Sequence, residues 1–127
     1  MRPNDRSYLD SHEWAQLSGN LVTVGITDFA VEQLGELVYL DLPAPGRKLK
    51  RGESFGEVES VKAVSDINSP VEGEVVEVNK ALTDELSDLQ DHPFQAGWLI
   101  KVKVAGPAAL AGLMDAPAYE KVVASEA

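Results

Sequence analysis

The chain has 127 residues and no cysteine, which excludes thiol chemistry, a disulfide framework and a thiolate metal site of its own. That length suffices to bury a core without a structural metal, so we expect a single domain over residues 1–127. The formal net charge of −10 and the lack of a Lys/Arg block argue against nucleic-acid binding and favour basic protein partners.

A strand and a short helix are predicted in the first third of the chain. Residues 21–26, Leu-Val-Thr-Val-Gly-Ile, are rich in residues that favour strands. Thr27 or Asp28 then offers an N-cap to a helix over residues 28–34, and Gly35 provides a stop.

The middle of the chain predicts short strands separated by turns. Val38, Leu40 and Leu42 alternate with less apolar residues, which indicates a half-buried strand before the turn at 43–46. Further short strands are predicted over 48–50, 52–59, 64–68, 73–78 and 99–104. Short strands at this spacing, with Gly and Pro turns between them, are typical of a sandwich or a barrel.

The end of the chain predicts helices. After Gly106 and Pro107 the composition turns to Ala, Leu and Met, which favours a helix over residues 108–114. Pro117 fits the first turn of another helix that runs to about Val123. These helices would cover a face or an edge of the sheets.

An internal repeat relates two parts of the chain. Residues 26–28 correspond to 64–66, and residues 35–40 correspond to 73–78, both at an offset of 38. Two sheets related by a pseudo-two-fold axis would explain this repeat, whereas chance similarity between valine-rich strands is the alternative.

The repeat also predicts which side chains face the core. Val38 and Leu40 of the first copy would point inward, as Val76 and Val78 of the second copy would.

Lys62 lies between two predicted strands, with no Gly or Pro at the crossing. The flanking Gly56, Gly73 and Ser69-Pro70 are typical of a tightly built hairpin that displays Lys62 at its tip. An exposed ammonium is a poor nucleophile, so this position disfavours Schiff-base catalysis and favours acylation by another enzyme. An ordinary solvated lysine is the alternative.

The run Glu59 to Ala63, Glu-Ser-Val-Lys-Ala, resembles the lipoylation site of the glycine cleavage system H protein. Blocks similar to those of this family occur in the family's order at 11–14, 24–28, 34–35, 42–43, 69–79 and 97–101. The chain departs from the family at Leu86 and Phe94, where the family commonly has Pro and Tyr.

The resemblance implies a mainly β fold, a lipoyl-domain-like barrel-sandwich hybrid of two antiparallel sheets with pseudo-two-fold symmetry. Short helices would lie near residues 28–34 and at the C-terminus. It also implies a monomeric carrier, not an enzyme, with lipoate joined covalently to Lys62 by a lipoate ligase or lipoyl transferase.

Three partner enzymes follow from the resemblance. The carrier would shuttle the aminomethyl group of glycine from the pyridoxal-phosphate-dependent glycine decarboxylase to the aminomethyltransferase, which uses tetrahydrofolate. Dihydrolipoamide dehydrogenase, which contains FAD, would then reoxidise the arm. Docking would present the tip of the arm to each enzyme at high effective concentration.

Other carrier classes use a lysine in a similar position. Biotin carriers typically have Met on both sides of the lysine, and lipoyl domains of 2-oxoacid dehydrogenases usually have Asp before it. Val61 and Ala63 fit neither pattern. A lipoyl relay protein, which donates its arm to other lipoyl domains, an unmodified adaptor and a biotin-type carrier, which the flanking residues disfavour, remain alternatives.

Two carboxylates are candidates for a cleft that docks the arm. The resemblance places Glu13 and Asp66 near it, where they would suit a cationic aminomethyl group, and turn capping is the alternative. His12, Glu13 and His92 lack the spacing of metal ligands, so no metal is expected. Trp98 is expected to anchor the core or a sheet face.

The location is predicted from what the sequence lacks. The first eight residues hold no apolar stretch of the kind that a signal peptide has, and no apolar run approaches the ~20 residues of a membrane span. We therefore expect a cytoplasmic protein that does not enter a membrane.

Overall fold

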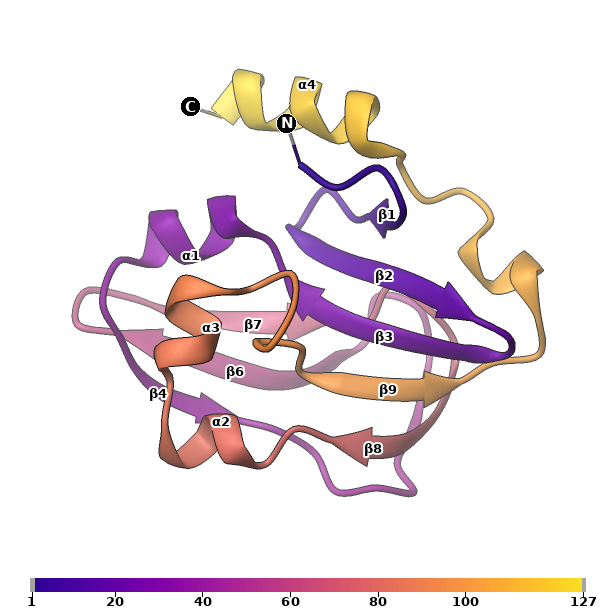
Figure 1. Cartoon of the computed structure of the whole chain (residues 1–127), viewed down its shortest axis with the longest axis horizontal. Helices are drawn as coiled ribbons and strands as arrows, with labels where there is room; N and C mark the ends of the chain where they lie inside the picture. Colours follow the sequence, from indigo (N-terminus) through magenta and orange to yellow (C-terminus); the bar gives the residue numbers. More distant parts are fainter. Residues whose placement is uncertain (1, 127) are drawn as a thin grey trace.

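The computed structural model describes residues 2–126, which form two antiparallel β-sheets with short helices around them (Figure 1). The large sheet has the strand order β1-β2-β3-β9-β8-β5, and the small sheet has the order β4-β6-β7. The strands of the large sheet are β1 (Ser7–Tyr8), β2 (Glu13–Ser18), β3 (Leu21–Ile26), β9 (Ile100–Lys103), β8 (Gly73–Val78) and β5 (Lys48–Leu49). Those of the small sheet are β4 (Leu37–Asp41), β6 (Ser54–Ser60) and β7 (Val64–Asn68).

The helices are short except at the C-terminal end. They are α1 (Asp28–Leu34), α2 (Ala81–Asp84), α3 (Ser87–Asp91), the 3₁₀ helix η1 (Pro107–Leu110) and α4 (Ala116–Glu126). This architecture confirms the predicted barrel-sandwich hybrid of two antiparallel sheets with short helices near 28–34 and at the C-terminus. Among residues 2–126, no helix is both long and apolar enough to cross a membrane.

The first predicted helix begins and ends as its sequence indicates. The hydroxyl of Thr27 accepts a hydrogen bond from the Ala30 N–H at 3.2 Å, which satisfies one of the free donors of the first turn of α1. Gly35 has a φ of 87° and donates its N–H to the Val31 carbonyl at 3.0 Å. A side chain at this left-handed φ would be strained, so glycine is suited to end the helix.

The predicted helix over residues 108–114 is wrong. Only one 3₁₀ turn forms, and Gly112 then adopts a φ of 85°, which interrupts a right-handed helix. Met114 instead pairs with Tyr8 through two backbone hydrogen bonds of 2.8 and 2.9 Å. The next helix, α4, is confirmed with Pro117 in its first turn, and it extends beyond Val123 to Glu126.

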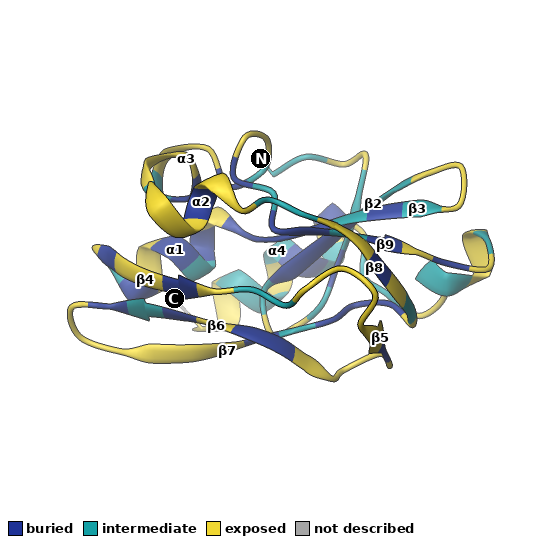
Figure 2. Cartoon of the chain, turned by 90° about the horizontal axis from the view of Figure 1, so that it is seen from below, coloured by how far each residue is buried: buried dark blue, intermediate teal, exposed yellow. Residues whose placement is uncertain are grey.

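The main core lies between the two sheets (Figure 2). The small sheet contributes Leu37, Leu40, Phe55, Val58 and Ile67, and the large sheet contributes Ala15, Val22, Val24, Ile26, Leu49, Val75, Ile100 and Val102. Burial of these apolar side chains is the main force that holds the sheets together.

A second cluster lies beneath α4. It consists of Tyr8, Trp14, Ala116 and Tyr119, and the rings of Tyr8 and Tyr119 stack with their centroids 4.7 Å apart. The N-terminal strands β1 and β2 therefore pack against the C-terminal helix, which Figure 1 shows on one side of the large sheet.

The internal repeat is visible as a pair of β-bulges. Strand β4 has a register shift between Leu37 and Tyr39, and β8 has one between Val75 and Glu77, which lie 38 residues later. The two strands belong to different sheets. The repeated sequence thus forms the same local structure once in each sheet.

The predicted inward orientation of Val38 and Val76 is wrong. These side chains are 49% and 42% exposed, because the extra residue of each bulge interrupts the alternation of faces along the strand. Leu40 is buried as predicted, and Val78 packs half-buried against the core.

Candidate functional site

Lys62 is exposed at the tip of the β6–β7 hairpin, which lies at the end of the molecule opposite β5 (Figure 2). The buried Ser60 shapes this tip. Its Oγ accepts hydrogen bonds from the N–H groups of Lys62 at 3.3 Å and Ala63 at 3.1 Å, and its N–H donates to the Ala63 carbonyl at 2.8 Å. The lysine backbone is therefore fixed while the side chain stays open to solvent.

The corner between α1 and β4 supports the tip from one side. The Val61 N–H donates to the Glu36 carbonyl at 3.0 Å. A Cβ atom added at Gly35 would lie only 3.6 Å from Lys62 Cε, so the lysine stem passes close to the glycine backbone. The Lys62 side chain therefore leaves the hairpin in a defined direction.

Helix α3 holds that corner in place. Gln90 accepts a hydrogen bond from the Leu37 N–H at 2.9 Å and donates one to the Gly35 carbonyl at 3.1 Å. The roles of Ser60 and Gln90 were not predicted from the sequence. A Ser two residues before Lys62 is a turn signal from which the role of Ser60 could have been predicted. Gln90 carries no local signal, because it is 53 residues from Leu37.

Glu13 is buried between the sheets' edges and has only 1% of its surface exposed. Its carboxylate accepts hydrogen bonds from the Ser11 hydroxyl at 2.5 Å and from the Asn68 N–H at 2.8 Å. Burial raises the pKa of Glu13 from 4.5 to about 7, although these two hydrogen bonds oppose the shift. Glu13 is therefore a carboxyl group that titrates near neutral pH.

Asp66 lies on β7, two residues before the Asn68 to which Glu13 bonds, so the structure brings Glu13 to the strand that carries Asp66. The side chain of Asp66 is exposed and stands in register with Glu57 of β6. The two carboxyl groups differ in environment, since one is buried and already hydrogen-bonded and the other faces water.

The contacts of His12 and Trp98 are with neighbouring side chains of the fold. The ring of His12 contacts the Tyr119 hydroxyl at 2.8 Å and a Glu126 carboxylate oxygen at 2.9 Å. Trp98 is half-buried against the second cluster, and the Lys101 ammonium lies 4.9 Å from its ring centroid. In the part of the chain that the structure describes, no group of three or more His, Asp or Glu side chains is placed to hold a metal ion.

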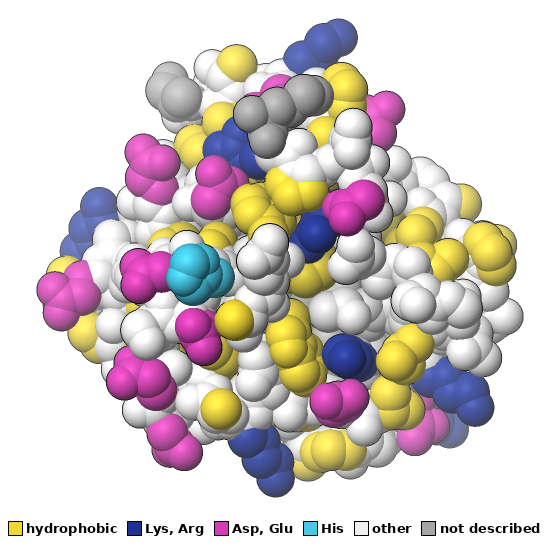
Figure 3. Space-filling view, viewed as in Figure 1, with side chains coloured by type: hydrophobic (Ala, Val, Ile, Leu, Met, Phe, Trp, Pro, Cys, Tyr) yellow, Lys and Arg dark blue, Asp and Glu magenta, His cyan; other side chains and the backbone are white. Residues whose placement is uncertain are grey.

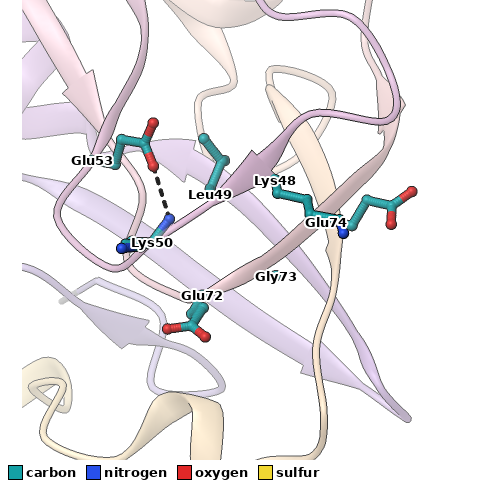
Figure 4. Close-up of a pocket in the computed structure, with 7 residues that line it drawn as sticks. All are labelled: Lys48, Leu49, Lys50, Glu53, Glu72, Gly73 and Glu74. Carbon is teal, nitrogen blue, oxygen red and sulfur yellow. Dashed lines mark hydrogen bonds between the residues drawn. The ribbon is translucent and has the colours of Figure 1, made fainter.

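A shallow pocket of about 420 Å³ lies at the β5–β8 edge (Figure 4). Lysine and glutamate side chains surround it, and the Lys50 N–H donates to Glu53 at 3.0 Å. At Gly73, which lines the pocket, an added Cβ would lie 2.2 Å from the Lys103 carbonyl oxygen. Glycine is thus required there because two strands approach closely, and the pocket belongs to the opposite end of the molecule from Lys62.

Residues 6–126 match the family model described as Glycine cleavage H-protein. A glycine cleavage system H protein of Acaryochloris marina is 48% identical over 121 residues, covering 95% of this chain and 94% of that protein. Glycine cleavage system H protein 2, mitochondrial, of Arabidopsis thaliana is 48% identical over 122 residues, covering 96% of this chain and 78% of that protein.

Among solved structures, the crystal structure of a glycine cleavage system H protein from Mycobacterium marinum is similar with a TM-score of 0.89 and 41% identity. The alignment covers 97% of this chain and 99% of that chain. The similarity therefore includes both sheets and the hairpin that carries Lys62.

Proposed function

Because the chain belongs to the glycine cleavage H-protein family, we propose that it is a carrier whose Lys62 receives lipoate as a covalent lipoyl-lysine. The observation that carries this proposal is the structure of the β6–β7 hairpin tip. Lys62 is exposed, its backbone is held by Ser60, and the neighbouring Val61 is anchored to Glu36. An enzyme can approach this lysine while the hairpin holds it still.

The surroundings of Lys62 fit a long acyl arm. Gly35 has no side chain that could press on the Lys62 side chain, which passes close to it, and the flanking Val61 and Ala63 are both exposed. When bound, lipoate supplies a dithiolane that is electrophilic when oxidised and nucleophilic when reduced. The chain itself contains no cysteine, so it presents the arm and leaves the chemistry to partner enzymes.

The family relationship supports one particular carrier role. We propose that the chain carries the aminomethyl group of glycine from glycine decarboxylase to the aminomethyltransferase, and that dihydrolipoamide dehydrogenase restores the arm. The net charge of −10 would attract each basic partner surface in turn without a tight complex. We further propose a monomer that acts in the cytoplasm.

Glu13 and Asp66 are proposed to receive the cationic end of the loaded arm. Asp66 is open to solvent, so it can meet an ammonium group first. Glu13 is buried with a raised pKa, and a cation beside it would favour its ionised form and gain a charge-assisted hydrogen bond. This docking requires the Ser11–Glu13 contact to open, because the carboxylate is covered in the present structure.

A reconstituted transfer assay tests the role. Lipoylated protein is mixed with glycine decarboxylase, aminomethyltransferase, glycine and tetrahydrofolate, and methylene-tetrahydrofolate is measured. The proposal expects glycine-dependent product with the parent and none with Lys62→Arg. A protein that passes its lipoyl group to other lipoyl domains, yet gives no glycine-dependent product, would be a relay protein and would overturn the aminomethyl role.

A further inference from the structure

Exposed hydrophobic side chains are concentrated on the small sheet and at the β6–β7 turn, which carries Lys62. Of the five large hydrophobic residues that are exposed among those described, four lie on β4 or at the ends of the β6–β7 turn. They are Val38, Tyr39, Val61 and Val64, with exposures of 49%, 51%, 67% and 60%. Scattered single exposures are ordinary, whereas a contiguous group marks a contact surface.

Strand register places two of these side chains in one row. Tyr39 of β4 stands opposite Glu59 of β6, and Glu59 stands opposite Val64 of β7. Residues directly opposite each other in antiparallel strands point to the same face, with Cβ atoms about 4.5–5.5 Å apart. Tyr39 and Val64 therefore flank Glu59 on the outer face of the small sheet.

The next row on that face is acidic. Asp41, Glu57 and Asp66 stand opposite one another across all three strands. Like charges directly opposite each other destabilise a sheet. No ion pair or side-chain hydrogen bond joins these carboxylates to another group within residues 2–126, and β4, β6 and β7 contain no Lys or Arg. The repulsion is uncompensated in the free protein.

The opposite side of the molecule is also acidic. Figure 3 shows acidic side chains gathered over α2 and α3, which lie on the side away from the outer face of the small sheet (Figure 2), and these helices contain Asp84, Asp88 and Asp91. An anionic lipid surface, a nucleic acid or the same face of a second copy would each meet repulsion at the row of carboxylates on the small sheet. The surface fits a partner with a basic rim.

We propose that the outer face of the small sheet, formed by Tyr39, Val64 and the carboxylates of Asp41, Glu57 and Glu59, docks the enzyme that acylates Lys62. The partner surface would have an apolar centre that covers Tyr39 and a rim of Lys and Arg. This inference rests on the proposed function, and it names the surface by which the lysine is recognised.

The position of the patch favours the acylating enzyme over the other partners. Acylation joins Lys62 Nζ to the carbonyl carbon of an activated lipoyl group, and the leaving group and a proton depart. This enzyme must bring its active site to Nζ itself, so it has to cover the surface beside the hairpin tip. An enzyme that reacts at the far end of the long arm can keep its distance from the small sheet.

The test measures kcat and KM for acylation of full-length protein by a purified lipoate–protein ligase supplied with lipoate and ATP. Two patch variants are compared with the parent: Tyr39→Thr, which removes the ring, and Asp41→Asn/Glu57→Gln, which removes two charges. The controls are Val76→Thr and Glu72→Gln, since both residues are exposed and lie on or beside β8 of the large sheet.

Tyr39→Thr is expected to raise KM by about fivefold to tenfold, as aromatic residues at the centre of an interface do. The charge variant should raise KM by about threefold to tenfold at low ionic strength, and this effect should fade as salt is added. Both variants should leave kcat near the parent value. The melting temperature of the charge variant should equal or exceed that of the parent because repulsion is removed, so its weaker docking cannot result from unfolding.

The docking surface is ruled out if the parent is acylated normally and both patch variants keep the parent KM. It is also ruled out if the two control variants raise KM as much as the patch variants do. A parent that the ligase does not acylate at Lys62 contradicts the proposed function as well, so the two failures can be told apart.

Discussion

Glu13 of the large sheet and Asn68 of the small sheet are joined by a hydrogen bond of 2.8 Å from the Asn68 N–H to the Glu13 carboxylate. The contact links the two sheets at the end of β7 that lies away from the β6–β7 turn. Because Glu13 is buried, its carboxyl group is destabilised in the charged form, and its pKa is raised to about 7. A structural contact between the sheets is therefore sensitive to pH near neutrality.

The first prediction concerns stability against pH. The folded state holds the Glu13 proton up to about pH 7, whereas the unfolded chain loses it near 4.5, so stability falls as pH rises between these values. The slope from this group reaches about 1.4 kcal/mol per pH unit. Glu13→Gln should abolish that slope, which urea unfolding at pH 5, 6, 7 and 8 measures. Equal slopes in parent and variant would show that Glu13 titrates normally.

The second prediction concerns the loaded arm. A charge-assisted hydrogen bond in a partly desolvated site is worth roughly 1.5–3 kcal/mol, or about a tenfold to hundredfold bias toward the docked arm. Glu13→Gln and Asp66→Asn should still become lipoylated at Lys62 but release formaldehyde faster from the aminomethyl-loaded protein. Formaldehyde is measured over time after the decarboxylase is removed. Loss at the parent's rate in both variants would assign these carboxylates to structure alone.

The third prediction compares two glycines. At Gly73 a Cβ would lie 2.2 Å from the Lys103 carbonyl oxygen, so Gly73→Ala should push β8 from its neighbour and cost about 2 kcal/mol. Gly106 has extended backbone with a φ of 165° and nothing within 4 Å of an added Cβ, so Gly106→Ala is the matched control. Thermal unfolding of both variants checks the difference. Equal melting temperatures would show that the β8–β9 contact tolerates a side chain.

The fourth prediction concerns the lysine tip. Ser60→Ala removes the acceptor for the N–H groups of Lys62 and Ala63, and it should lower the free energy of unfolding by about 1 kcal/mol and slow acylation of Lys62. Ser65→Ala, at an exposed position on β7, is the control. Urea unfolding and the initial rate of lipoylation measure the two effects. A Ser60→Ala protein that is acylated at the parent's rate would mean that the tip needs no hydroxyl.

Local signals predicted much of the fold. Strands over 21–26, 64–68 and 73–78 coincide with β3, β7 and β8, because alternating or β-branched residues are bounded there by Gly, Pro or Asn. The bulges in β4 and β8 escaped prediction, since an extra residue in a strand has no fixed sequence signal. As a result Val38 and Val76 were assigned to the wrong face.

Long-range contacts account for the other differences. The segment over 108–114 has a helical composition, but its pairing with Tyr8 near the N-terminus and the left-handed Gly112 prevent a helix. Strand β1 has only two residues, too few for a sequence pattern, and it forms by pairing with β2 in the folded chain. The functional site likewise combines local signals with long-range contacts. Lys62 stands out in its hairpin, whereas the support from Gln90 depends on tertiary structure.

Intact mass spectrometry of the protein from a lipoate-competent host, followed by peptide mapping, tests the central claim that Lys62 carries lipoate. The account predicts a mass increase of one lipoyl group that maps to Lys62, and no increase in Lys62→Arg, which keeps the charge but offers no amine for acylation. An unmodified parent, or a lipoyl group that persists in Lys62→Arg, would contradict it.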